Sequence, residues 1–484
     1  MQARIFIILI SIVAIAGACH RKLTTAIADP SPRVQDKAIQ AVHIPADFSA
    51  AVYDDLRFGR EIFDFYARRN FRPFWLEGAA RSLRADSMIM LIRSSRRFGL
   101  LPQHYHFQEI PGLMLETSNG IRKARLDVVL TDSFLAMMHD LKEGRFARNM
   151  SVDNMDSLRT AVLTDSLEPK DLRMALNSQE PRHDQYQLLK GALNTILDSI
   201  NPTDYDLLIQ GTTFDSVDVH RKVRSIEINL ERWRRETETL ANVYAWINVP
   251  AYMFYVVEDH QIAMESQVIV GSPDTPTPMF SSQIECFTVF PYWYVPRKIT
   301  VNEYLPIIKK DTSFISKNNF DVLDRSGNIQ ATASIDWRKY NSTNFPFTLR
   351  QREGRENSLG VIKFVFDNPY AVFLHDTNAK RLFKNKRRAY SHGCIRLEKA
   401  YEFAQYLIGD GRTKVPPRTL DKYLSERKRI TISLSAPVQI HIRYFTCEIK
   451  DGELLIFDDI YKKDATLIRL LYQQNGTGIS GKRI

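Results

Sequence analysis

The spacing of apolar residues changes near residue 243, and this change divides the chain into two regions. From 46 to 235 apolar residues recur at helical spacing, as in 53–66, 82–98 and 126–141. From 243 onward, short runs rich in β-branched and aromatic residues alternate with turns. The sequence therefore predicts a multidomain α+β protein, with an all-α region over 46–235 followed by a β-rich sandwich or barrel over 236–465.

Two further segments interrupt or end the β-rich pattern. Residues 297–347 are polar and Asn-rich, with a lone Trp337, which favours an inserted subdomain. Residues 466–484 predict a polar tail. A chain of 484 residues with 44% hydrophobic content can bury the cores of two or three domains.

The N-terminal segment predicts export from the cytoplasm. Arg4 precedes an apolar run from Ile5 to Ile15, and the small residues Ala16–Ala18 precede Cys19. The run is too short to span a membrane, so 1–19 is expected to be a cleaved signal. It resembles a bacterial lipoprotein signal, in which Cys19 would be lipidated; ordinary cleavage after Ala18 is the alternative. Residues 20–45 would then form a tether.

The formal net charge of +10 suits an anionic partner, such as a wall polymer, a membrane surface or nucleic acid. The basic residues are spread along the chain, however, which also fits an ordinary soluble basic protein. Neither a Cys-x-x-Cys nor a His-Glu-x-x-His pattern occurs, so we expect no metal site.

Three cysteines remain once Cys19 is set aside, and an odd number in an exported protein indicates a free thiol. Cys286 and Cys447 lie in strand-like runs and are expected to be small core residues, with a bridge between them left open. Cys394 alone follows a polar turn that contains a histidine.

The segments 371–377 and 390–397 place His375 nineteen positions before Cys394. A thiol with a pKa of about 8.5 is mostly protonated at neutral pH, so a nucleophilic cysteine needs a base. If the two segments run side by side, His375 can be that base and the amides of Gly393 and Cys394 can hold an oxyanion. His392 is a rival base. On these residues alone, a catalytic pair and two structural residues stay equally open.

The runs His375-Asp376-Thr377 and Ser391-His392-Gly393-Cys394, at this spacing, resemble the YkuD-like L,D-transpeptidase motif. Flanking stretches are similar to the large, capped YcbB-like branch of that family: 229–234, 248–252, 268–271, 276–278 and 350–360. The resemblance implies a helical scaffold, a β-rich catalytic domain and a capping subdomain inserted over the site.

The resemblance also implies roles for individual residues. Cys394 would be the nucleophile, His375 the general base, and the amides of His392, Gly393 and Cys394 the oxyanion site. The residues expected to frame the substrate, including two from the basic loop 380–388, are Arg396, Asn357, Gly360, Phe373, Trp337, Lys384 and Arg387. Two features depart from the branch. The segment 200–229 is too short for a peptidoglycan-binding domain, and Phe373 stands where tyrosine is common.

The expected reaction is transfer of a tetrapeptide stem of peptidoglycan from its terminal D-Ala to an amine of a second stem, giving a 3→3 cross-link. Transfer to water, as in an L,D-carboxypeptidase, or to a lipoprotein amine stays open, as does a non-catalytic envelope scaffold that binds partners. The resemblance implies no cofactor, no nucleic-acid partner and covalent inhibition by carbapenem β-lactams. We expect a membrane-anchored lipoprotein in the periplasm of a Gram-negative-type bacterium.

Overall fold

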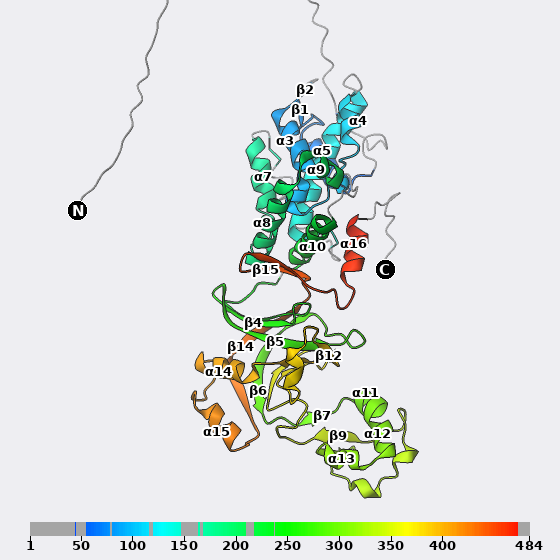
Figure 1. The fold of residues 1–484 in the computed structure, drawn as a ribbon. Coiled ribbons are helices and arrows are strands. Elements are labelled where there is room, and N and C mark those ends of the chain that lie inside the picture. Colours follow the sequence, from blue (N-terminus) through cyan, green and yellow to red (C-terminus); the bar gives the residue numbers. More distant parts are fainter. Residues whose placement is uncertain are drawn as a thin grey trace, which may run out of the picture. The chain divides into compact units, whose positions relative to one another are not determined.

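Two regions of different secondary structure follow each other along the chain, in the order that the apolar spacing predicts (Figure 1). This computed structural model describes residues 44, 55–77, 80–115, 120–146, 163–164, 168–209, 217–236 and 238–472. The signal segment, Cys19 and most of the tether lie outside these residues. No helix in the described ranges is long and apolar enough to cross a membrane.

The first region is helical, as expected, with one short hairpin in addition. Its helices are α2 (Gly59–Arg68), α3 (Leu83–Arg93), α4 (Ile110–Leu115), α5 (Gly120–Glu143), α7 (Pro169–Asn177), α8 (Asp184–Ser199), α9 (Pro202–Ile209) and α10 (Val217–Arg234). Strands β1 (Leu76–Glu77) and β2 (Ala80–Arg81) pair antiparallel. Two residues per strand give no apolar alternation, so the pattern could not predict them.

Helix α5 is the centre of the helical region. Every residue from Ala124 to Leu141 is buried, including several charged side chains. Buried polar groups require partners. The Asp127 carboxylate accepts hydrogen bonds from the backbone amides of Phe74, Trp75 and Leu76 at 2.9, 2.9 and 3.0 Å. Burial raises the pKa of Asp127 to about 6, against the effect of these bonds. The carboxylate thus fixes the chain that precedes the hairpin onto α5.

The second region is built on a nine-stranded sheet. Its strands are β3 (Val243–Asn248), β4 (Met253–Glu258), β5 (Gln261–Gly271), β6 (Phe280–Val289), β10 (Ile362–Phe366), β11 (Leu374–His375), β12 (Ala389–Ser391), β13 (Ile395–Leu397) and β14 (Ile430–Arg443). The order is β12-β5-β13-β11-β10-β6-β14-β3-β4, and β5 also pairs with β4. This extra pairing joins the strands from β5 to β4 into a closed ring, as in a barrel.

Apolar side chains from alternate strand positions form the core of the second region. Helix α14 (Ala400–Gly409) packs on it, with Phe403 against Phe254 and Phe364 at ring distances of 4.8 and 4.7 Å. Helix α15 (Thr419–Ser425) follows, with Leu420 buried in the same core. On β10, Ile362, Phe364 and Phe366 face this core.

A small subdomain with its own core is inserted between β6 and β10. It contains β7 (Trp293–Tyr294), α11 (Arg297–Ile299), the π-helical turn η4 (Thr300–Tyr304), α12 (Leu305–Lys310), α13 (Ser313–Lys317), β8 (Phe320–Leu323) and β9 (Thr348–Gln351). These strands form a separate sheet in the order β7-β9-β8. We call residues 293–351 the capping subdomain.

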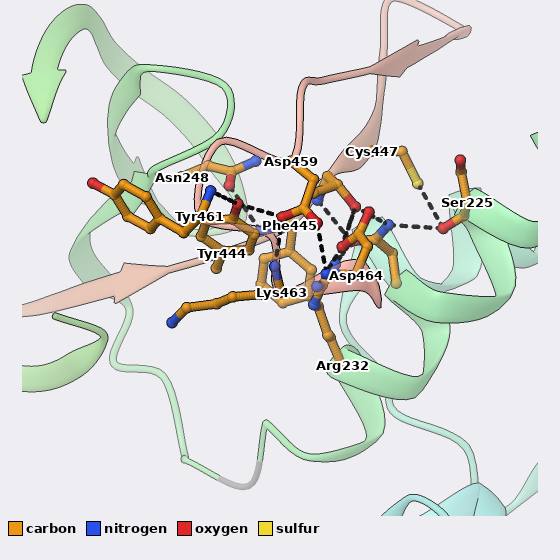
Figure 2. A network of polar contacts seen from close by, with 12 residues as sticks. Ser225, Arg232, Asn248, Tyr444, Phe445, Cys447, Asp459, Tyr461, Lys463 and Asp464 are labelled. Carbon is orange, nitrogen blue, oxygen red and sulfur yellow. Dashed lines mark hydrogen bonds and ion pairs between the residues drawn. The ribbon is translucent and has the colours of Figure 1, made fainter. Parts of the chain in front are cut away.

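The chain after β14 returns to helix α10 and joins the two regions (Figure 2). Arg232 on α10 donates to Asp464 at 2.5 Å and to the Thr446 hydroxyl at 3.0 Å. The Trp233 ring stacks on Phe445 with 4.1 Å between centroids. Strands β15 (Cys447–Lys450) and β16 (Glu453–Ile456) form a hairpin in this returning segment.

The segment ends in helix α16 (Asp464–Tyr472), which corrects the expectation of a polar tail from residue 466. Leu467 and Leu471 of this helix are buried with Leu101 and Ile228 of the helical region. The apolar positions are four apart, as on one face of a helix. Asp464, Thr466 and Arg469 interrupt the apolar residues of this short helix and obscured the pattern.

Substitution of the buried Asn229 tests the joint, by which we mean the contacts between α10 and the segment that follows β14. Its amide donates to the Thr446 hydroxyl at 3.0 Å, and its carbonyl accepts from the Thr446 amide at 2.8 Å. Asn229→Ala leaves the Thr446 amide buried without an acceptor, which should cost about 1–3 kcal/mol in urea unfolding. The exposed Asn177, at the end of α7, is the matched control. Equal unfolding midpoints for Asn229→Ala and Asn177→Ala would contradict this account of the joint.

Candidate active site

Three polar side chains form a row across neighbouring strands of the large sheet. Strand β11 pairs parallel with β13, with His375 opposite Arg396. It pairs antiparallel with β10, with Lys363 opposite His375. Side chains at opposed positions point to the same face of a sheet. Lys363, His375 and Arg396 therefore lie side by side on one face, with His375 in the middle.

Cys394 lies on the same face, beside this row. Side chains alternate along a strand, so the residue two before Arg396 faces the same way. The Ile395 amide donates to the Phe373 carbonyl at 2.9 Å, which brings Cys394 beside Phe373. Cys394 is thereby the diagonal neighbour of His375 on adjacent strands, a relation that spans about 7–8 Å and lies within reach of long side chains. The structure thus brings together the two residues that the spacing singled out.

His375 is buried, and its imidazole is held in one orientation. Its Nδ1 donates to the backbone carbonyl of Asp376. Because a carbonyl only accepts, Nδ1 carries the proton and Nε2 keeps the lone pair. Burial lowers the pKa of His375 to about 3, and the positive charges of Arg396 and Lys363 act in the same direction. His375 is therefore a neutral base at physiological pH.

Burial also raises the pKa of the Cys394 thiol. Hydrogen bonding to the Phe373 backbone, followed by the charges of Lys363 and Arg396, opposes this rise. The thiol lies against the Ala371 carbonyl, with 3.9 Å between sulfur and oxygen. A protonated thiol beside a neutral imidazole can act as a nucleophile by giving its proton to that imidazole.

The turn that presents Cys394 is held by local hydrogen bonds. Gly393 has φ of +108°, a conformation that favours glycine. The Thr277 hydroxyl donates to the Gly393 carbonyl at 2.9 Å. The Gly393 amide, one of the three expected oxyanion donors, already donates to the Ser391 hydroxyl at 3.2 Å. In the described part of the chain, the amides of His392 and Cys394 have no protein acceptor, so two donors stay available.

Residues 242–419 match the family model of the L,D-transpeptidase catalytic domain, YkuD. The chain carries a YkuD-family L,D-transpeptidase catalytic domain. Residues 60–193 match a second family model, described as a scaffold domain. Both the fold class and the family that the sequence predicts are therefore confirmed.

The chain is also similar to individual proteins. A Haemophilus influenzae protein named "Putative L,D-transpeptidase" is 27% identical over 410 residues, covering 82% of this chain and 77% of the relative. Among solved structures, an Enterococcus faecium L,D-transpeptidase mutant matches at 11% identity with a TM-score of 0.20, over 42% of this chain and 50% of that one. Mycobacterium tuberculosis L,D-transpeptidase 1 matches at 13% identity with a TM-score of 0.16, over 42% and 61%. The chain thus spans half to three fifths of these solved structures.

The rival base of the L,D-transpeptidase domain, His392, is directed toward the capping subdomain. Its Nε2 lies 2.8 Å from a carboxylate oxygen of Glu303, on η4. The side chain is exposed. His392 therefore forms a contact between the turn and the capping subdomain.

The other predicted substrate residues occupy three different environments. Trp337 is buried in the capping core beside Phe345 and Phe347, which corrects the expectation that it frames the groove. A lone tryptophan in a polar segment gives no signal that distinguishes a small core from a binding surface. Lys384 and Arg387 are exposed on the basic loop.

Asn357 and Gly360 shape the turn that precedes β10. The Asn357 side chain is buried and donates to the carbonyls of Arg352 and Pro291 at 2.9 and 3.2 Å. Gly360 has φ of +62° and lies against Asp376, whose Oδ2 accepts from the Val361 amide at 2.9 Å. These two residues fix the segment beside His375 rather than presenting a side chain to a ligand.

No role was predicted for Lys363, Glu303 or Thr277. A lysine between apolar residues of a strand-like run, as in Val361–Phe366, is a signal that could have found Lys363. Glu303 and Thr277 lie 89 and 116 positions from their partners, and no local pattern reports such contacts.

One cavity lies outside this site, and the structure describes two free thiols besides Cys394. A cavity of about 660 Å³ lies where α8 and α10 meet β3, β4 and β15, and no predicted site residue lines it. Cys286 and Cys447 are both free thiols, which excludes the bridge left open above. Within the described ranges, no group of three or more His, Cys, Asp or Glu side chains is arranged to hold a metal ion.

Gly360→Ala tests the close approach to Asp376. A Cβ at this position would meet the Asp376 Oδ2 atom at 2.3 Å. Gly327 is the control, because it also has positive φ but nothing within 4 Å of a built Cβ. We expect Gly360→Ala to lower the free energy of unfolding by roughly 2 kcal/mol more than Gly327→Ala, measured in urea. Equal losses would show that backbone strain alone matters.

Proposed function

We propose that this protein is a peptidoglycan L,D-transpeptidase in which Cys394 is the nucleophile and His375 the general base. The observation that carries the proposal is the placement of Cys394 diagonally beside a neutral His375, within the segment that matches the catalytic domain. The substrate is a tetrapeptide stem with a terminal D-Ala, and the first product is a thioester.

In the acylation step, Nε2 of His375 takes the Cys394 thiol proton. The sulfur attacks the carbonyl carbon of the third stem residue, forming the C–S bond. The amides of His392 and Cys394 stabilise the oxyanion of the tetrahedral intermediate. When the C–N bond to the terminal D-Ala breaks, its nitrogen takes the proton from the imidazolium, and D-Ala leaves.

In the second step, an amine of another stem attacks the thioester carbonyl. His375 takes a proton from that amine, the C–S bond breaks, and the proton returns to the sulfur. One amide is exchanged for another, so no external energy source is needed. The proposed product is a 3→3 cross-link. Water as acceptor would instead give a tripeptide, and a lipoprotein amine would give an anchored protein.

We propose a periplasmic location with a lipid anchor at Cys19, based on the signal-like segment 1–19. The exposed cations Lys384 and Arg387 of the basic loop are proposed to contact the carboxylates of the stem. A non-catalytic scaffold role is the alternative, and the strand register that sets Cys394 diagonally beside His375 supports the enzymatic proposal instead.

The nucleophile is tested by mass spectrometry of the intact protein after incubation with a carbapenem. The wild type and Cys286→Ala should gain one adduct, whereas Cys394→Ala should gain none. Cys286 is a matched control, because it is a second free, partly exposed thiol. An adduct on Cys394→Ala, or none on the wild type, would contradict the assignment. Incubation with a disaccharide-tetrapeptide then separates the acceptors, as dimer indicates a second stem and tripeptide indicates water.

The base is tested by comparing His375→Ala with His392→Ala. We expect His375→Ala to slow carbapenem acylation by roughly 100-fold or more, and His392→Ala by much less. Because the pKa of His375 is lowered to about 3, its neutral form is present throughout the physiological range. Wild-type acylation should therefore be flat between about pH 5 and 8, without a step near the usual histidine pKa. A step there, or the opposite order of the variants, would overturn the assignment.

A further inference from the structure

The ammonium group of Lys363 lies over the ring of Phe373, with 3.5 Å between Nζ and the ring centroid. Lys363 is a residue of β10 and lies in the same row as His375 and Arg396. Phe373 lies two residues before His375, just ahead of β11, and its carbonyl accepts from the amide of Ile395, the residue after Cys394. The side chain therefore reaches diagonally from its own strand toward the neighbourhood of the sulfur.

Among the described residues, no anion forms an ion pair with this ammonium. In the described ranges Lys363 makes neither an ion pair nor a hydrogen bond through Nζ, and the same holds for the guanidinium of Arg396. Both side chains are half-buried, and burial lowers the pKa of each. A partly desolvated cation without an anion is unfavourable, which marks the space between them as a place for negative charge. An aromatic face can hold an ammonium there without cancelling its charge.

The other groups around Lys363 leave that positive charge in place. On β6, Thr288 lies opposite Lys363, and Cys286 faces the same way two residues before it. On β11, the neighbouring His375 is neutral at physiological pH. From η4, Tyr304 interacts with Arg396, while the Glu303 carboxylate is paired with His392. The Asp376 carboxylate is paired with Lys380 at 2.6 Å.

We propose that Lys363 is the electrostatic partner of the Cys394 sulfur, and that its ammonium, held over Phe373, stabilises the thiolate together with Arg396. The inference rests on the proposed role of Cys394 as nucleophile. Two cations on either side of His375 disfavour a positive imidazole and favour a negative sulfur. The Phe373 ring holds the ammonium by a cation–π contact. A tyrosine hydroxyl, which is common at this position in the family branch, is not needed for that contact.

The test is the rate of Cys394 alkylation by iodoacetamide as a function of pH. A Cys19→Ser, Cys286→Ala background leaves Cys394 as the one partly exposed thiol among the described residues. Removing a nearby cation raises a thiol pKa. Lys363→Met should therefore move the midpoint to higher pH and slow alkylation at pH 7 by roughly tenfold. Lys363→Arg should restore most of the rate.

Lys428→Met is the matched control. Lys428 also lies over an aromatic ring, that of Tyr423, with 5.6 Å between Nζ and the ring centroid, but it is away from the site. Lys363→Gln replaces Lys363→Met if the latter does not fold.

A profile for Lys363→Met and Lys363→Gln that coincides with the Lys428→Met profile would overturn the inference. Alkylation by iodoacetate is a second measurement, because this reagent carries a carboxylate that a substrate-binding cation would attract. If Lys363 recognises substrate carboxylates instead, its loss will slow iodoacetate while leaving the iodoacetamide profile unchanged, and the proposal fails. Both measurements are independent of transpeptidation. A shifted iodoacetamide midpoint in a protein that forms no thioester with a tetrapeptide would uphold the role of Lys363 and refute the proposed function.

Discussion

The parallel pairing of β11 with β13 is the constraint on which the site depends. It fixes His375 opposite Arg396 and so sets Cys394 diagonally beside the imidazole. A slip of one residue would turn His375 into the apolar core, because side chains alternate between the two faces of a strand. Strand β11 contributes only two residues to its pairing with β13, so other contacts must hold the register of these two strands. Asp376 provides them: its amide donates to the Ile362 carbonyl at 2.8 Å, and its carboxylate accepts from Val361.

The electrostatics of the site follow from this register. Burial raises the pKa of the thiol and lowers that of the imidazole, so a preformed pair of opposite charges is disfavoured. The proton has to move when the sulfur attacks. A fixed Nδ1 bond to the Asp376 carbonyl keeps Nε2 ready to receive it. The cations on both sides of the imidazole favour negative charge on the sulfur and oppose positive charge on the imidazole.

A continuous series of polar contacts connects the helical region with the catalytic turn. It begins at Arg232 on α10, passes through Asp464 and Asp459, and continues through the Tyr444 hydroxyl to Tyr461 (Figure 2). The Thr277 amide donates to the Tyr461 hydroxyl at 3.1 Å, and the Thr277 hydroxyl donates to the Gly393 carbonyl at 2.9 Å. This series of contacts links the helical region to the turn that presents Cys394, and none of the described helical residues belongs to the candidate site.

The sequence by itself determined the two regions and the two central residues, because these depend on local patterns. Helical spacing and strand alternation are visible within one segment, and Cys394 and His375 stand out by residue type and by the loop between them. The tertiary structure decided that Nδ1 of His375 donates to the Asp376 carbonyl, that Trp337 belongs to a core, and that α16 packs against Ile228. It also placed Lys363 over Phe373. Each of these depends on strand register or on contacts between distant segments, and no local pattern of residues encodes either.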